Sequence, residues 1–191
     1  MRAVLTAAAL LLAVSGCAVP APAPVDISAK SAAIADRFQT ELQAQLQAAL
    51  TASGPVGAIG VCQQAAPAIA ANLSEESGAE VRRIALKERN PAALAEGELR
   101  KRLEQLAAAP LDASGKPAAV QWTSGSGRDA RAHYLRAIPM KAQPCAACHG
   151  TSIAPEVRAK LAELYPLDKA SGFKPGDLRG AIVISWPLER H

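Results

Sequence analysis

Apolar residues recur at helical intervals in the first part of the chain. Asp26 to Leu50 predicts an amphipathic helix, because an apolar residue recurs at every fourth position from Ile34 onward and forms one stripe. Ser53-Gly54-Pro55 then ends this helix. A second helix is expected from Val56 to Leu73, where apolar residues alternate at spacings of three and four, and Cys62 falls on its apolar face. The stripe of the first helix consists of Ile34, Phe38, Leu42, Leu46 and Leu50.

The second half of the chain carries strand patterns. Glu80 to Lys87 predicts one strand, and Val120 to Thr123 with Arg131 to Ile138 predict two more around the turn SGSG. The apolar run AIVISW, Ala181 to Trp186, suits a central strand. Helices are expected in between, at Leu94 to Ala109 and Pro155 to Leu164. Because helices come first and strands cluster later, we expect an α+β fold.

The N-terminal residues have the pattern of an export and anchoring segment. Arg2 precedes an apolar stretch from Ala3 to Val14, which is shorter than the about 20 residues of a membrane-spanning helix. The sequence Val14-Ser15-Gly16-Cys17 then resembles the lipobox of bacterial lipoproteins, whose cysteine is lipidated after cleavage. An ordinary signal peptide with an incidental cysteine is the alternative. We expect a signal peptide over residues 1–16 and a periplasmic lipoprotein anchored to a bacterial membrane through Cys17.

The next residues indicate a spacer followed by one domain. Alternating Ala and Pro in AVPAPAPV favour an extended polyproline II conformation, so residues 17–27 are expected to form a tether. Residues 28–191 are long enough for one compact domain. With aromatic residues at only 3%, Ala, Leu and Val must build its core.

Composition and charge exclude several function classes. The net charge of +4 is spread along the chain without a basic stripe, so we expect no nucleic-acid partner. The acidic residues are scattered as well, and neither a paired-carboxylate nor a Ser/His/Asp arrangement stands out. We therefore expect that the protein is not an enzyme.

The stretch PCAACHG holds the most specific motif. C-x-x-C-H is the attachment pattern of haem c. We therefore expect Cys145 and Cys148 each to bond one vinyl group of a haem, and His149 to bind its iron. Such attachment takes place outside the cytoplasm, where the signal peptide directs this chain. The alternatives are weaker. A zinc site needs two more ligands, a thioredoxin-like dithiol is expected early in a βαβ unit, and a plain disulfide leaves His149 unexplained.

The second axial ligand of the iron stays open at this level. Met140 and His133 are candidates, and so is the terminal His191. Cys62 is the remaining thiol in an oxidising compartment and lies beside small residues on an apolar helix face, although a buried structural cysteine has the same pattern. Basic side chains near the motifs are candidate partners of the haem propionates: Arg82, Arg83, Arg89 and Arg131.

Three segments resemble a bacterial family of exported haem c domains. They are GAIGVCQQAAPAIA, VRRIALKERNPA, and AIPMKAQPCAACHG with LYPLDKASGFKPGDLRGAIVISWP. The resemblance covers roughly residues 30–190. It implies a PAS-like antiparallel sheet with N-terminal helices flanking one covalently bound haem. It also implies Cys62 and His149 as the axial ligands, with Cys145 and Cys148 as the covalent attachments. The chain departs from sensor-kinase members of this family in having a lipobox and no output domain.

Two functions follow as expectations. A thiolate ligand favours ferric iron, so the first is a low-potential electron carrier or redox buffer with a redox partner protein. The second is a redox or gas sensor that acts on a separate partner in the cell envelope. The sequence does not fix the oligomeric state.

Overall fold

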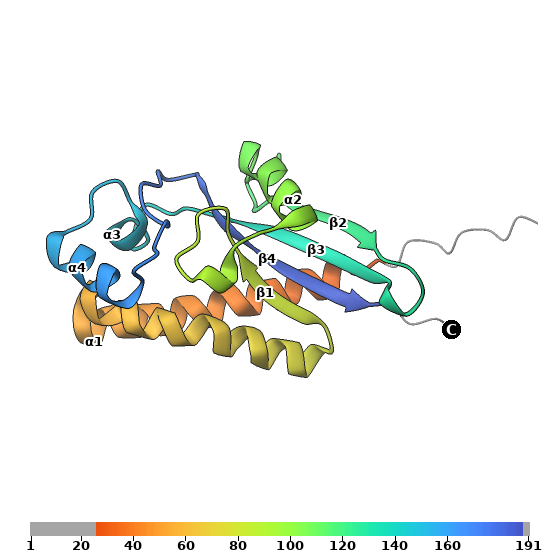
Figure 1. Ribbon diagram of the computed structural model, residues 1–191, viewed down its shortest axis with the longest axis horizontal. Coiled ribbons are helices and arrows are strands. Elements are labelled where there is room, and N and C mark those ends of the chain that lie inside the picture. The colour runs from red at the N-terminus through yellow and green to blue at the C-terminus, as the bar shows by residue number, and fades with distance from the viewer. Residues whose placement is uncertain (1–25, 189–191) are drawn as a thin grey trace, which may run out of the picture.

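The computed structural model describes residues 26–188 (Figure 1). The expected signal peptide, the expected lipidation site Cys17, most of the expected tether and His191 lie outside these residues. The described elements are α1 (Ser28–Ser77), β1 (Glu80–Ile84), η1 (Pro91–Ala93), α2 (Gly97–Ala108), β2 (Ala119–Ser124), η2 (Gly127–Asp129), β3 (Arg131–Pro139), α3 (Ala146–His149), α4 (Pro155–Leu164) and β4 (Leu178–Pro187).

The four described strands form one antiparallel sheet in the order β1-β4-β3-β2. β4 is a central strand, as its apolar run predicts, and Ala181 to Ile184 are almost fully buried. Sequential neighbours β2 and β3 form the expected hairpin, whereas β4 returns from the C-terminal end of the chain to pair with both β1 and β3. The expected α+β fold with a PAS-like antiparallel sheet is confirmed.

α1 is a helical hairpin with two arms. Its backbone is helical except at Gly54, where φ is 64° and ψ is −173°. This conformation is accessible almost only to glycine, and it reverses the chain direction, so the arms run side by side beneath the sheet (Figure 1). The two helices expected around Ser53-Gly54-Pro55 are therefore the two arms, and the second continues to Ser77, beyond the expected end at Leu73.

Each face of the sheet has its own apolar core. α1 covers one face and α2 lies over the other (Figure 1). The core on the α1 side includes Phe38, Ile69, Leu73, Val81, Ile182 and Ile184. The core on the α2 side includes Ile84, Leu103, Leu106, Leu135 and Val183. Successive strand residues thus alternate between the two cores, as the period of two in a β-strand requires.

A third apolar cluster fixes the end of the molecule that carries the CAACH motif. α4 packs on the tip of the α1 hairpin through Ile59, Val157, Leu161 and Tyr165. Met140, Ala170 and Phe173 form a small cluster next to it, against which Cys145 and Ala146 pack. The motif is consequently held between α1 and the loop that leads into β4.

By length and hydropathy alone, part of α1 passes as a candidate membrane span. In this fold its two arms pack on the sheet through Phe38, Ile69 and Leu73. Core helices of water-exposed domains pass the same composition test. We therefore interpret α1 as part of the folded domain.

The conformation of Gly54 generates a stability prediction. Replacing it with Ala forces a Cβ into a glycine-only region, and we expect Gly54→Ala to lower the free energy of unfolding by about 1–3 kcal/mol. Gly60→Ala is the matched control, because Gly60 is helical and a Cβ there has nothing within 4 Å. It should raise stability by about 0.5–1 kcal/mol. Denaturant unfolding measures the free energy of unfolding of both variants. Equal changes in the two variants would contradict the glycine-only backbone conformation at Gly54.

Candidate functional site

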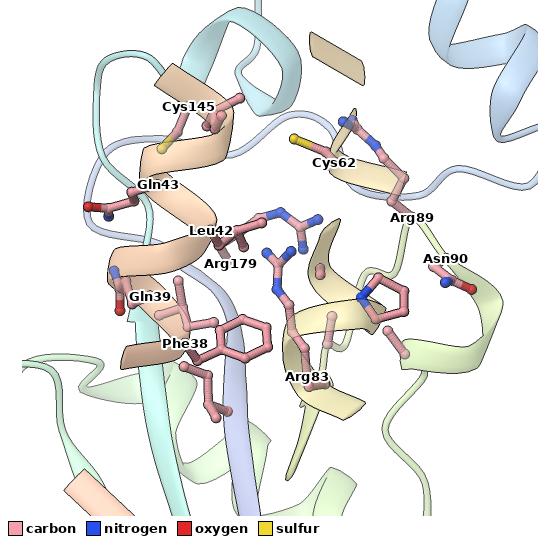
Figure 2. A pocket seen from close by; sticks show the side chains of 18 of the residues that line it. Phe38, Gln39, Leu42, Gln43, Cys62, Arg83, Arg89, Asn90, Cys145 and Arg179 are labelled. Carbon is pink, nitrogen blue, oxygen red and sulfur yellow. The ribbon is translucent and has the colours of Figure 1, made fainter. Parts of the chain in front are cut away.

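A cavity of about 500 Å³ lies between the α1 hairpin, the sheet and the CAACH segment (Figure 2). Its volume falls in the range of cofactor and ligand sites, about 300–1,000 Å³. One wall is apolar and comes from the first arm of α1, through Leu42, Leu46 and Leu50. These leucines are only half-buried, whereas Phe38 of the same stripe is 1% exposed because it packs on the sheet. The outer part of the predicted apolar stripe therefore lines the cavity, and Leu42 also packs against the core between α1 and the sheet.

The CAACH motif forms a single helical turn on another wall. The N–H of His149 donates to the carbonyl of Cys145 at 3.0 Å, and that of Gly150 donates to Ala146 at 3.0 Å. Residues at i, i+3 and i+4 share one side of a helix, so Cys145, Cys148 and His149 all line the cavity. Both cysteines are free thiols in the described structure. The structure thus brings together the three motif residues that the sequence predicts.

The His149 ring is held in one orientation. Its Nδ1 lies 2.7 Å from the carbonyl oxygen of Ala170, and the edge of Phe173 contacts the ring at 6.5 Å between centroids. Nε of Arg179 also lies 3.2 Å from Nδ1, but one nitrogen cannot donate and accept at once, and the shorter contact favours donation to Ala170. Burial, then the charge of Arg179, lowers the pKa of His149 well below its usual value. The neutral ring leaves Nε2 free to bind a metal.

Cys62 enters the cavity from the second arm of α1. It is a half-buried, free thiol, and Figure 2 places it on a different element from Cys145. Burial raises its pKa, and the positive charge of Arg83 acts in the opposite direction. Cys62 and His149 thus place a thiol and an imidazole, two side chains that can bind a metal, on two separate walls of the cavity.

The alternative axial ligands are placed less favourably. Met140 lines the cavity but packs with Ala170 and Phe173, on the wall that holds His149. His133 is not among the lining residues: its ring stacks on Trp122 at 4.7 Å and contacts Ser124 and Ser185 through its two nitrogens. Trp122 packs with the core on the α2 side of the sheet. Among the described candidates, Cys62 is the one on a wall separate from His149.

Arginine side chains gather around the cavity. Of the four expected from the sequence, Arg82, Arg83 and Arg89 line the cavity and Arg131 does not. Arg82 pairs with Glu80 at 3.6 Å. Arg89 pairs with Asp168 at 3.0 Å and donates to the carbonyl of Cys148 at 2.6 Å, which fastens the motif to the loop after α4.

Arg179 is a lining residue that the sequence analysis missed. It is 6% exposed and lies just before the apolar run of β4, in the sequence DLRGA. A charged residue at the entrance of a central strand was the available signal. The next residue, Gly180, permits close strand pairing, because a Cβ there would stand 2.5 Å from the carbonyl oxygen of Ile84.

The donor set fits a haem better than a directly bound metal ion. Among residues 26–188 no three His, Cys, Asp or Glu side chains are grouped to hold an ion, so the zinc alternative has no support there. A haem iron needs only two axial protein ligands. The apolar leucine wall suits a flat macrocycle, and the arginines suit acidic substituents at its edge.

Comparisons with known proteins agree with this interpretation. The family model described as Tll0287-like matches residues 24–187. A solved structure, the crystal structure of the cyanobacterial haem protein Tll0287, superposes with a TM-score of 0.66 at 27% sequence identity. The match covers 88% of this chain and 99% of that one. A search of curated proteins found no match.

The ion pair behind the motif generates a second prediction. Arg89 and Asp168 are only 11% and 13% exposed, so removing the carboxylate leaves a nearly buried cation without its partner. Asp168→Asn keeps an oxygen for the N–H of Ala170, and we expect it to lower the free energy of unfolding by about 3 kcal/mol. Glu163→Gln is the control, since its pair with Lys160 is exposed and should contribute less than about 1 kcal/mol. If denaturant unfolding showed equal losses of free energy of unfolding in the two variants, a structural role of Asp168 would be contradicted.

Proposed function

The chain belongs to the Tll0287-like family of PAS-like haem domains, and from this premise we propose that it is a lipid-anchored c-type cytochrome of the cell envelope. The proposed function is low-potential electron transfer or redox buffering with a redox partner protein. The observation that carries it is the meeting of Cys145, Cys148, His149 and Cys62 around one cavity, although Cys62 lies far from the motif in sequence. A bound haem would supply one-electron chemistry at its iron.

Covalent attachment is supported by the geometry of the motif turn. Cys145 and Cys148 are free, half-buried and on the side of α3 that faces the cavity, where thioether bonds to two vinyl groups require them. The single turn also presents His149 to the same space. We propose these residues as the two attachments and one axial ligand of a single haem c.

Cys62 is the proposed second axial ligand. It approaches from the second arm of α1, whereas Met140 shares the wall of His149 and His133 lies on the α2 side of the sheet. Burial raises the pKa of the Cys62 thiol and the charge of Arg83 offsets this only in part, so the thiolate would form on binding of the iron, which releases the proton. A thiolate places negative charge on the iron and stabilises the ferric state, which is the basis of the proposed low potential.

The anchoring is proposed from the sequence. The segment from Arg2 to Cys17 has the order of a lipoprotein signal, and the Ala/Pro-rich tether follows it directly. Export also supplies the compartment in which haem c is attached. We therefore place the domain in the periplasm, held at a bacterial membrane by a lipid on Cys17.

A sensor function is the second candidate. The PAS-like fold and the relation to a haem protein also suit a domain that changes state with its iron, and weakening of the bond to Cys62 on reduction would open a coordination position. The two functions differ in one measurable property. Rapid binding of carbon monoxide by the reduced protein would favour the sensor, and a closed site would favour the carrier.

The experiment on the axial ligand compares the ferric wild type with Cys62→Ala by absorption and EPR spectroscopy. We expect a thiolate-type low-spin signal in the wild type that the substitution abolishes, together with a higher reduction potential. Met140→Leu serves as the control, because Met140 lines the same cavity, and it should keep the thiolate signal. Unchanged spectra in Cys62→Ala would remove both the assignment and the basis of the low potential.

A further inference from the structure

The cavity has a one-sided charge. Its lining includes five basic side chains and no Asp or Glu: Arg82, Arg83, Arg89, Lys141 and Arg179. Two of the arginines have acidic partners outside the lining, since Arg82 pairs with Glu80 at 3.6 Å and Arg89 pairs with Asp168 at 3.0 Å. Lys141 is exposed to solvent. Arg83 and Arg179 remain as two cations inside the cavity without a carboxylate in the described part of the chain.

The side chains of these two arginines lie close together, and no negatively charged group in the described residues pairs with either of them. Figure 2 shows both guanidinium groups directed into the same space from β1 and β4. Within residues 26–188, no hydrogen bond or ion pair involves the Arg83 side chain. The polar contacts of Arg179 are Nδ1 of His149 at 3.2 Å and the carbonyl oxygen of Lys87 at 3.4 Å, and its guanidinium also lies over the Phe173 ring, 5.4 Å from the centroid; none of these partners carries a negative charge.

Holding two uncompensated guanidinium groups in one cavity costs free energy unless an anion occupies the space between them. Arg179 is buried and Arg83 is half-buried. Taking a cation out of water without a counter-charge is unfavourable, and two like charges side by side add repulsion. A guanidinium satisfies a carboxylate through two parallel N–H···O bonds, which makes a pair of arginines a suitable site for two carboxylates. The ligand must also be apolar in its body, because Leu42 and Leu46 form the neighbouring wall.

We propose that Arg83 and Arg179 form the site for the two haem propionates, an inference that rests on the proposed haem c function. The propionates would then point inward, toward the junction of β1 and β4. The opposite edge of the macrocycle, bonded to Cys145 and Cys148, would lie toward α3.

The charges of the assembled site balance under this assignment. A ferric porphyrin core carries one positive charge, and the Cys62 thiolate cancels it. Two propionates then face two arginines. On reduction the core gains one negative charge, which the same arginines stabilise, so this pair raises the reduction potential and opposes the effect of the thiolate.

Arg83→Gln is the most direct test because that side chain has no described protein partner whose loss would disturb the fold. In the holoprotein we expect a lower reduction potential and a shifted propionate bending band in the resonance Raman spectrum. Arg83→Lys keeps the positive charge, so its reduction potential should stay close to that of the wild type. Its propionate bending band should still shift, because an ammonium group cannot bind a carboxylate through two parallel N–H donors. Arg179→Gln should act in the same direction.

Arg100→Gln removes the same charge from an exposed ion pair with Glu104, outside the cavity, and should change neither property. A potential and a propionate band that stay unchanged in Arg83→Gln would overturn the inference. If the wild type carries haem with its thiolate signal in that case, the proposed function still stands. A wild type without haem would instead overturn the proposed function itself.

Discussion

The orientation of the His149 ring depends on one hydrogen bond, from its Nδ1 to the carbonyl oxygen of Ala170 at 2.7 Å. The loop that offers this oxygen is itself fixed by Arg89, which contacts the carbonyls of Cys148 and Ala170 and pairs with Asp168. Removing this loop would free both the ring and the motif turn. The short helix α3 could not hold its position alone, because a single turn has too few backbone bonds to be stable by itself.

The second requirement of the site is a wall that faces this ring, and the α1 hairpin supplies it. The reversal at Gly54 brings the second arm back along the sheet, so Cys62 reaches the cavity although it precedes His149 by much of the chain. The same hairpin buries Phe38, Ile69 and Leu73 against the sheet. The helical hairpin α1 therefore has two roles: some of its side chains pack in the core beneath the sheet, and others line the cavity.

The sequence predicted local features well. The period of the apolar residues located both arms of α1, and the Pro at the start of Pro155–Leu164 placed α4 within its observed bounds. The C-x-x-C-H spacing identified the motif because its chemistry is local. The family expectation is confirmed as far as a haem domain with a PAS-like sheet, whereas the covalent and axial bonds stay predictions.

What the sequence could not supply depends on contacts between distant segments. The sequence did not indicate Arg179 as a cavity residue, because its neighbours in the cavity, Arg83 and Arg89, lie far away in the sequence, on β1 and on the loop that follows β1. His133 looked like a candidate ligand until pairing in the sheet put it beside Trp122. A strand pattern gives the alternation of faces, but only the tertiary fold decides which face meets a cavity.

The most direct test of the account is the intact mass of the protein under denaturing conditions. The full-length protein, from Met1, would be produced in a bacterium that matures c-type cytochromes, with a known cytochrome c from the same host as control. The account predicts one haem per chain that survives denaturation and is lost in the double variant Cys145→Ala/Cys148→Ala. A folded, exported wild type whose mass lacks haem, beside a fully loaded control, would contradict it.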